Sequence, residues 1–219
     1  SPATLPAAVV EHAKLCILDA TGIALASHRQ PYAAQVLGAA RALGGNGPSP
    51  VFGVNDGLPL RDALLVNGTL VHGLDFDDTH SASVVHCTAS AWPLAFNLGL
   101  QQGVSGAAAL AAYVLAVEID ATLGAAARGQ LQKRGVHPTG VIAAFGCATA
   151  ASWLQGLNPA QCRDALGIVL SMAGGSMEFL SDGASTKRMH PGWAAVCGVT
   201  AAALAAQGFS GPRAAIEGR

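Results

Sequence analysis

Charged side chains are scarce in this chain. Only 11% of its 219 residues are Asp, Glu, Lys or Arg, against about 25% in a typical soluble domain. The 12 basic and 13 acidic residues nearly cancel, so the chain lacks the basic excess of a nucleic-acid-binding protein. Disorder is excluded by the 51% of hydrophobic residues. So few charges cover a free surface poorly, and we expect part of that surface to face another subunit or domain.

Uncharged runs are long, but they do not have the composition of a transmembrane helix. Residues 84–117 contain no Asp, Glu, Lys or Arg. A membrane-spanning helix needs about 20 predominantly apolar residues, and this run is interrupted by Pro93, Asn97 and Gly103. Aromatic belts do not flank it. We therefore predict a buried helix of a soluble protein and no membrane partner.

Paired cysteines and a signal peptide are also lacking. The five cysteines are odd in number, widely spaced and without a CxxC motif. We interpret them as small buried hydrophobic residues in a reducing compartment. Residues 1–6 have no basic n-region of the kind that begins a secretory signal peptide. These features predict a cytoplasmic protein.

No alternating strand pattern is present, whereas apolar residues recur at helical spacing in many segments. Prolines that could open helices and glycines that could end them set the expected boundaries. Thr4 is the expected cap of the first helix. Helices are predicted over 6–27, 31–43, 59–75, 84–102, 106–128, 138–155, 159–173 and 191–207. Residues 51–54 are expected to be extended, 76–83 to form a loop and 174–186 a glycine-bearing segment. With no repeat or linker, residues 1–219 read as one all-α domain.

The densest group of polar side chains lies between residues 72 and 86. It consists of three carboxylates and three imidazoles: Asp75, Asp77, Asp78, His72, His80 and His86. Burying such groups is costly unless they are paired or functional. Three interpretations stay open: a capping and salt-bridge network, a divalent metal site, and metal-free proton transfer. Because the spacing matches no HExxH or EF-hand pattern, we favour proton transfer without a metal.

Two further histidines, His137 and His190, each stand directly before a proline that could begin a helix. The residue before proline avoids the α region, so each histidine is expected at a helix N-cap. Free backbone N–H groups and the positive end of the helix dipole lie there. Such an end attracts carboxylates and disfavours imidazolium. A neutral histidine beside a bound anion is therefore a candidate base.

Lys187 and Arg188 stand out because the chain has few cations. They follow a glycine-bearing segment that could present its backbone to a ligand. One interpretation is a solvated turn. The functional alternative is that they bind a carboxylate and stabilise an enolate-like charge.

Three segments resemble motifs of the MmgE/PrpD family. They are Val66 to His80 with His86 shortly after, Gly135 to Gly140, and Thr186 to Ala195. The resemblance runs along the whole chain. It implies a large helical domain of the MmgE/PrpD fold, which in the family is joined to a smaller α/β lid domain that does not fall within these residues. It also implies a homodimer.

The resemblance further implies action on a small polycarboxylate without a cofactor or a required metal. The residues implied as catalytic are Asp75, His86, His137 and Lys187. Those implied as substrate-binding are Thr79, Arg188 and His190.

Within this family, we predict a lyase that eliminates water from a 2-methylcitrate-like tricarboxylate by acid/base catalysis. Epimerisation of an iminodisuccinate-like substrate and decarboxylation of cis-aconitate are the alternatives on the same scaffold. A non-catalytic helical assembly domain is the alternative of a different class.

Overall fold

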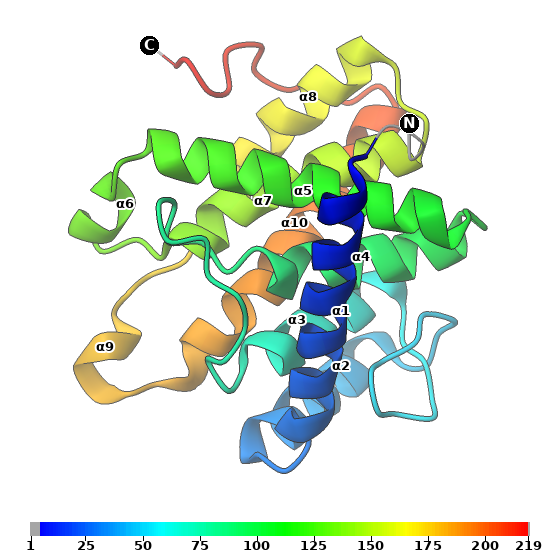
Figure 1. The fold of residues 1–219 in the computed structure, drawn as a ribbon, viewed down its shortest axis with the longest axis vertical. Helices are drawn as coiled ribbons and strands as arrows, with labels where there is room; N and C mark the ends of the chain where they lie inside the picture. The colour runs from blue at the N-terminus through cyan, green and yellow to red at the C-terminus, as the bar shows by residue number, and fades with distance from the viewer. Residues whose placement is uncertain (1–4, 219) are drawn as a thin grey trace.

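The computed structural model describes residues 5–218 and is all-helical, as the sequence predicts (Figure 1). The chain is 66% helical, and between residues 5 and 218 the only β pairing consists of isolated bridges. The elements are α1 (Ala7–Ser27), α2 (Pro31–Gly44), α3 (Leu60–His72), α4 (Thr88–Gln101), α5 (Gly106–Ala126), α6 (Gln130–Lys133), α7 (Pro138–Leu154), α8 (Pro159–Leu170), α9 (Phe179–Asp182), the 3-10 helix η2 (Ser185–Met189) and α10 (His190–Ala206).

Helix α10 lies at the centre, where it packs against α7, α3 and α8 (Figure 1). Small residues allow this close packing. A Cβ on Gly192 would come within 2.3 Å of the Leu65 carbonyl oxygen of α3, and one on Gly198 within 2.5 Å of the Cys147 Cβ of α7. Glycine at both positions therefore lets two neighbouring helices approach α10 directly.

Two helices are long and apolar enough to pass a length-and-composition test for membrane spans. The segment Ser185–Ala206 is 67% buried inside the protein in its most apolar window, as expected of a core helix. The most apolar window of α5 (Gly106–Ala126), by contrast, is only 22% buried. Helix α1 adds exposed leucines, with Leu15 63% and Leu18 71% exposed. The outer faces of α1 and α5 thus leave apolar surface uncovered.

Asp120 is a buried acid on the inner side of α5. It is completely buried, and neither carboxylate oxygen has a hydrogen-bond partner. Oδ1 faces Gly146 of α7, where a Cβ would come within 2.2 Å of it. Burial raises the pKa of Asp120 well above its usual value, because the charged form is poorly solvated there.

This raised pKa predicts how stability depends on pH. Above the usual Asp pKa the unfolded chain binds fewer protons at this site than the folded one, so the free energy of unfolding falls as pH rises. Asp120→Asn keeps the shape of the side chain and removes the ionisation. We expect the variant to be more stable than wild type at about pH 8 and to lose that advantage at about pH 4. Urea unfolding at both pH values measures this, with exposed Asp19→Asn as control; an equal effect at both would contradict it.

Several helices are shorter than the sequence predicts. Helix α3 ends at His72 rather than at residue 75, because Asp75 has a left-handed φ of 59°. Helix α4 begins at Thr88 rather than 84, because Val84 has a φ of 55° and the backbones of His80 and Val85 pair. Helices α5 and α8 stop two and three residues short of their expected ends.

Three short helical pieces were not predicted. They are α6, which follows α5, α9, which lies in the expected glycine-bearing segment 174–186, and η2, which begins at the end of that segment. The expected extended piece at 51–54 is wrong: these residues form a turn closed by the Val54 N–H to the Val51 carbonyl. Thr4 lies outside the described residues.

Candidate active site

Helix ends from distant parts of the chain meet at one place. His72 is the last residue of α3, His137 precedes α7, and His190 begins α10. Because α10 packs against both α3 and α7, these ends lie together, and the loop 73–87 closes over them. The site is thus positioned by the most buried helices of the domain.

One buried carboxylate orients two imidazoles. The oxygens of Asp77 lie 2.9 and 3.1 Å from Nδ1 of His72, and Oδ2 lies 3.3 Å from Nδ1 of His86. The Asp77 and His72 side chains are fully buried. Burial alone would raise the pKa of Asp77, but the hydrogen bonds from His72 and His86 lower it to about 2. Asp77 therefore stays ionised, and both rings donate to it from Nδ1.

The two histidines that contact Asp77 differ in their surroundings. Nε2 of His72 is buried and has no hydrogen-bond partner. Nε2 of His86 lies 3.8 Å from Oδ1 of Asp75, and its side chain is 13% exposed. Burial lowers the pKa of His86, but the hydrogen bond and charge of Asp77 outweigh this and raise it. His86 therefore favours the imidazolium form, a potential proton donor.

Lys187 of η2 forms an ion pair with Asp75. Burial raises the pKa of Asp75, but the hydrogen bond and charge of Lys187 outweigh it and lower that pKa. Arg188 is held against the protein: its Nε donates to the Gly73 carbonyl at 3.1 Å, and its guanidinium stacks over the Tyr32 ring. The unpredicted helix η2 is what brings both cations to the loop.

The two histidines that precede prolines contact each other. Nδ1 of His137 and Nδ1 of His190 are 3.0 Å apart, so one donates and the other accepts. His137 is the N-cap of α7, as predicted. His190 is not an N-cap but the first helical residue of α10, because η2 continues directly into that helix.

Both of these histidines favour the neutral form. Burial, followed by the charges of the neighbouring histidines and Lys187, lowers the pKa of His137 to about 3. Burial, His72 and Lys187 also lower the pKa of His190. The ring of Phe179, from the unpredicted helix α9, packs edge-on against both. A neutral histidine beside an imidazolium-favouring one gives the site a base and an acid.

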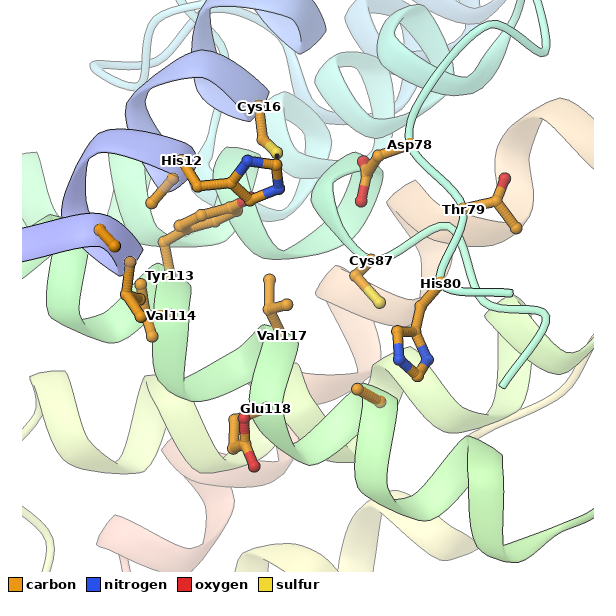
Figure 2. Close-up of a pocket in the computed structure, with 14 residues that line it drawn as sticks. His12, Cys16, Asp78, Thr79, His80, Cys87, Tyr113, Val114, Val117 and Glu118 are labelled. Atoms are coloured by element: carbon orange, nitrogen blue, oxygen red, sulfur yellow. Dashed lines mark hydrogen bonds between the residues drawn. The ribbon is translucent and has the colours of Figure 1, made fainter. Parts of the chain in front are cut away.

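A second cavity lies on the other side of the loop 73–87. It measures about 560 Å³ and is lined by residues of α1, α5 and the loop (Figure 2). His12 and Cys16 reach it from α1, and Tyr113 from α5 (Figure 2). Thr79 stands at its edge, and Oγ1 of Thr79 is 3.2 Å from Nδ1 of His86. Residues 78–80 of the loop thus line this mainly apolar cavity, and Thr79 connects its edge to His86.

The polar network of histidines and carboxylates is reached through a cavity of about 260 Å³. His72, Asp75, Lys187 and Arg188 line it, together with residues of α9 and the segment that follows. His86, His137 and His190 do not line it; they lie behind it, in contact with His72 or with one another. The arrangement places two cations at the mouth and imidazoles further in, which suits a small anion.

Six of the seven sequence-predicted site residues are linked through close approaches of their side chains, and Arg188 lines the same cavity as Asp75 and Lys187. Asp75 pairs with Lys187 and approaches His86, which contacts Thr79. The ring centroids of His86 and His137 are 6.3 Å apart. The predicted residues are Asp75, Thr79, His86, His137, Lys187, Arg188 and His190, and their roles in catalysis and binding remain predictions.

His72 and Asp77 were not among the predicted site residues, although both stand in the polar segment between residues 72 and 86. Only the fold distinguishes Asp77, which is buried on the imidazoles, from Asp78, which accepts a hydrogen bond from the Thr88 N–H at the start of α4. Ligand atoms of His72, His86 and His137 lie within 4.8 Å of one another. The same cluster could therefore hold a metal ion.

Comparison with known proteins identifies relatives along the whole chain. The family model of the MmgE/PrpD N-terminal domain matches residues 1–219. The chain is 33% identical over 217 residues to cis-aconitate decarboxylase of Homo sapiens, covering 95% of this chain and 44% of that protein. It is 31% identical over 218 residues to the cis-aconitate decarboxylase-like protein oryM of Aspergillus oryzae, covering 96% and 45%. Cis-aconitate decarboxylase of Aspergillus terreus is 29% identical over 219 residues, covering 97% and 44%. The chain thus spans less than half the length of these relatives.

Proposed function

Because the chain belongs to the MmgE/PrpD family, we propose that it carries the acid/base groups of a lyase that decarboxylates a small unsaturated tricarboxylate of the cis-aconitate type. The observation that carries this proposal is the network joining Lys187 and Asp75 at the cavity mouth to His86 and His137 behind it. The names of the relatives support the choice of reaction and substrate.

Decarboxylation of such a substrate needs charge stabilisation and one proton. The bond between the CH₂ carbon and its carboxylate breaks, and CO₂ leaves. The electron pair forms a new double bond to the central carbon, and the former double bond shifts its electrons to the carbon beside another carboxylate. That carbon then takes one proton, which gives an unsaturated dicarboxylate.

The residues can be assigned to these steps. Lys187 binds a substrate carboxylate in place of Asp75 and stabilises the charge that develops on it. His86, held by Asp77 and favouring the imidazolium form, supplies the proton. His137 stays neutral. It therefore carries no positive charge that would attract the substrate anion away from Lys187. Arg188 and the N-termini of α7 and α10 add favourable potential for a polycarboxylate.

Elimination of water from a 2-methylcitrate-like substrate is the second candidate. It requires a base that takes the proton next to a carboxylate and an acid that protonates the leaving hydroxide. The opposite pKa shifts of His137 and His86 favour such a pair. This elimination uses the same groups, with His137 as the base.

The test uses the gene product that carries this chain, incubated separately with cis-aconitate and with 2-methylcitrate. We expect cis-aconitate to release CO₂ and to give an unsaturated dicarboxylate. Proton NMR measures the formation of this product. A new conjugated double bond from 2-methylcitrate without CO₂ release would replace the first candidate by the second. No turnover of either substrate, together with no calorimetric binding of either, would contradict both and favour a non-catalytic assembly domain.

We also propose that the protein forms a homodimer, that it acts in the cytoplasm, and that residues 1–219 form a single helical domain within it. The uncovered leucines of α1, such as Leu15 and Leu18, and the apolar outer face of α5 support self-association. Sedimentation velocity at several concentrations is expected to show a dimer that Leu18→Glu weakens, whereas Lys14→Glu on the same helix does not. A concentration-independent monomer would contradict this.

A further inference from the structure

We propose that the histidine cluster, His72, His86 and His137, is a binding site for one late first-row divalent metal ion, with Zn²⁺ as its representative. Each of the three side chains offers one ligand atom, and these atoms lie within 4.8 Å of one another. Imidazole nitrogen is a preferred ligand of zinc, nickel and copper. Three imidazoles with a fourth position left open form a common zinc arrangement.

The orphaned nitrogen of His72 is the strongest reason to expect an occupant. Nε2 of His72 has no partner, although the His72 side chain is fully buried. A buried polar nitrogen without a hydrogen bond is costly. Because Nδ1 already donates to Asp77, Nε2 carries the lone pair. It can therefore accept a hydrogen bond or coordinate a metal ion.

Asp77 supplies the support that metal-binding histidines usually have. Its carboxylate contacts Nδ1 of both His72 and His86. Nε2 of His72 is then without a partner, and Nε2 of His86 faces Asp75 at 3.8 Å. A carboxylate behind a ligating histidine fixes the tautomer and the orientation of the ring. One acid therefore prepares two ligands at once, and His137 supplies the third from the start of α7.

Little movement is needed to form the site. Tetrahedral zinc with bonds of about 2.0–2.1 Å places its nitrogen ligands about 3.3 Å apart, so the rings must close by at most about 1.5 Å. His86 lies on the loop 73–87, where its ring can adjust. The carboxylate of Asp75, which belongs to a second, overlapping group of possible ligands with His72, Asp77 and His86, is close enough to approach the fourth position.

The consequence for activity is inhibition. An ion at this site replaces the proton that His86 supplies in the proposed lyase and occupies His137 as well, and this part of the inference rests on the proposed function. Binding itself does not depend on that function. It can therefore be measured without any substrate.

The experiment is calorimetric titration of the chelator-treated protein with ZnCl₂, joined by the absorption spectrum of the Co²⁺ form. We expect one ion per chain and the intense visible bands of tetrahedral cobalt. His86→Gln should weaken binding at least about tenfold, and Asp77→Asn about 10–100-fold, as for other groups behind metal ligands. His12→Gln on α1, outside the cluster, is the matched control and should leave the affinity unchanged.

Three outcomes would overturn the proposal: no stoichiometric binding to folded wild type, unchanged affinity in His86→Gln, or an equal loss in His12→Gln. Circular dichroism establishes that each variant is folded, and His86→Gln keeps the test decisive if Asp77→Asn does not fold. Failure here leaves the lyase proposal intact, because that proposal is tested by substrate turnover and does not depend on a metal ion. Conversely, zinc binding in a protein that turns over neither substrate would support the metal site alone.

Discussion

Lys187→Ala is expected to lower kcat/KM for a cis-aconitate-type substrate by about 10²–10³-fold, the loss typical when a group that stabilises developing charge is removed. Lys187 is the cation that faces Asp75 at the mouth of the polar cavity. Without it, a substrate carboxylate would meet the carboxylate of Asp75 unscreened. Steady-state kinetics of wild type and variant, with calorimetric binding of the substrate, measure the effect.

Stability provides the control for this variant. The Asp75 side chain is 57% exposed, so water solvates it when its partner is lost, and exposed ion pairs contribute little to folding. The melting temperature should therefore change little while activity collapses. Lys14→Ala, which removes a cation from an exposed pair with Glu11 on α1, should leave both unchanged. Activity of Lys187→Ala within about twofold of wild type would remove Lys187 from the proposed site.

His86→Gln is expected to lower kcat by about 10²–10⁴-fold, the usual contribution of a positioned proton-transfer group. Glutamine can still donate a hydrogen bond to Asp77, but it cannot supply a proton to carbon. Because Lys187 and Arg188 remain, substrate binding should stay within a few-fold of wild type. The two effects are separated by single-turnover kinetics and by calorimetry with the substrate.

The neighbouring His80 is the matched control. It lies on the same loop, but Nδ1 contacts the Ser83 hydroxyl at 2.9 Å and the side chain lines the apolar cavity of Figure 2. His80→Gln should keep the activity of wild type. Equal losses in both variants would indicate that the loop as a whole, and not the His86 ring, had been disturbed.

Helices could be predicted from the sequence where apolar periodicity and prolines coincide. Pro138 and Pro159 begin α7 and α8 as expected, because proline fits the first turn of a helix and sets its φ. The four-residue helices α6 and α9 are too short to show any periodicity. The left-handed residues Asp75 and Val84 ended or delayed helices that their composition favoured, since tertiary contacts outweigh propensity there.

The candidate site could be predicted only in part. The motifs indicated which residues matter, but spacing along the chain does not tell which carboxylate in the polar segment meets which imidazole. His72 and Asp77 form the buried pair because α3 ends at His72, directly before Gly73; glycine marks such an end, but it does not tell which carboxylate beyond it reaches the ring. The displacement of His190 from an N-cap to the first turn follows from η2, which rests on contacts with α3.

The site is assembled from partners far apart in the chain: Lys187 and Asp75 are 112 residues apart, and His137 and His190 are 53 apart. The entropic cost of closing such long loops is offset only when the helices that carry these residues have docked. An intermediate that lacks a docked α10 would hold none of these pairs. The native imidazole resonances of these histidines are therefore expected to appear together and late in NMR spectra recorded during refolding. Their appearance would report the docking of α10 as the last step of folding.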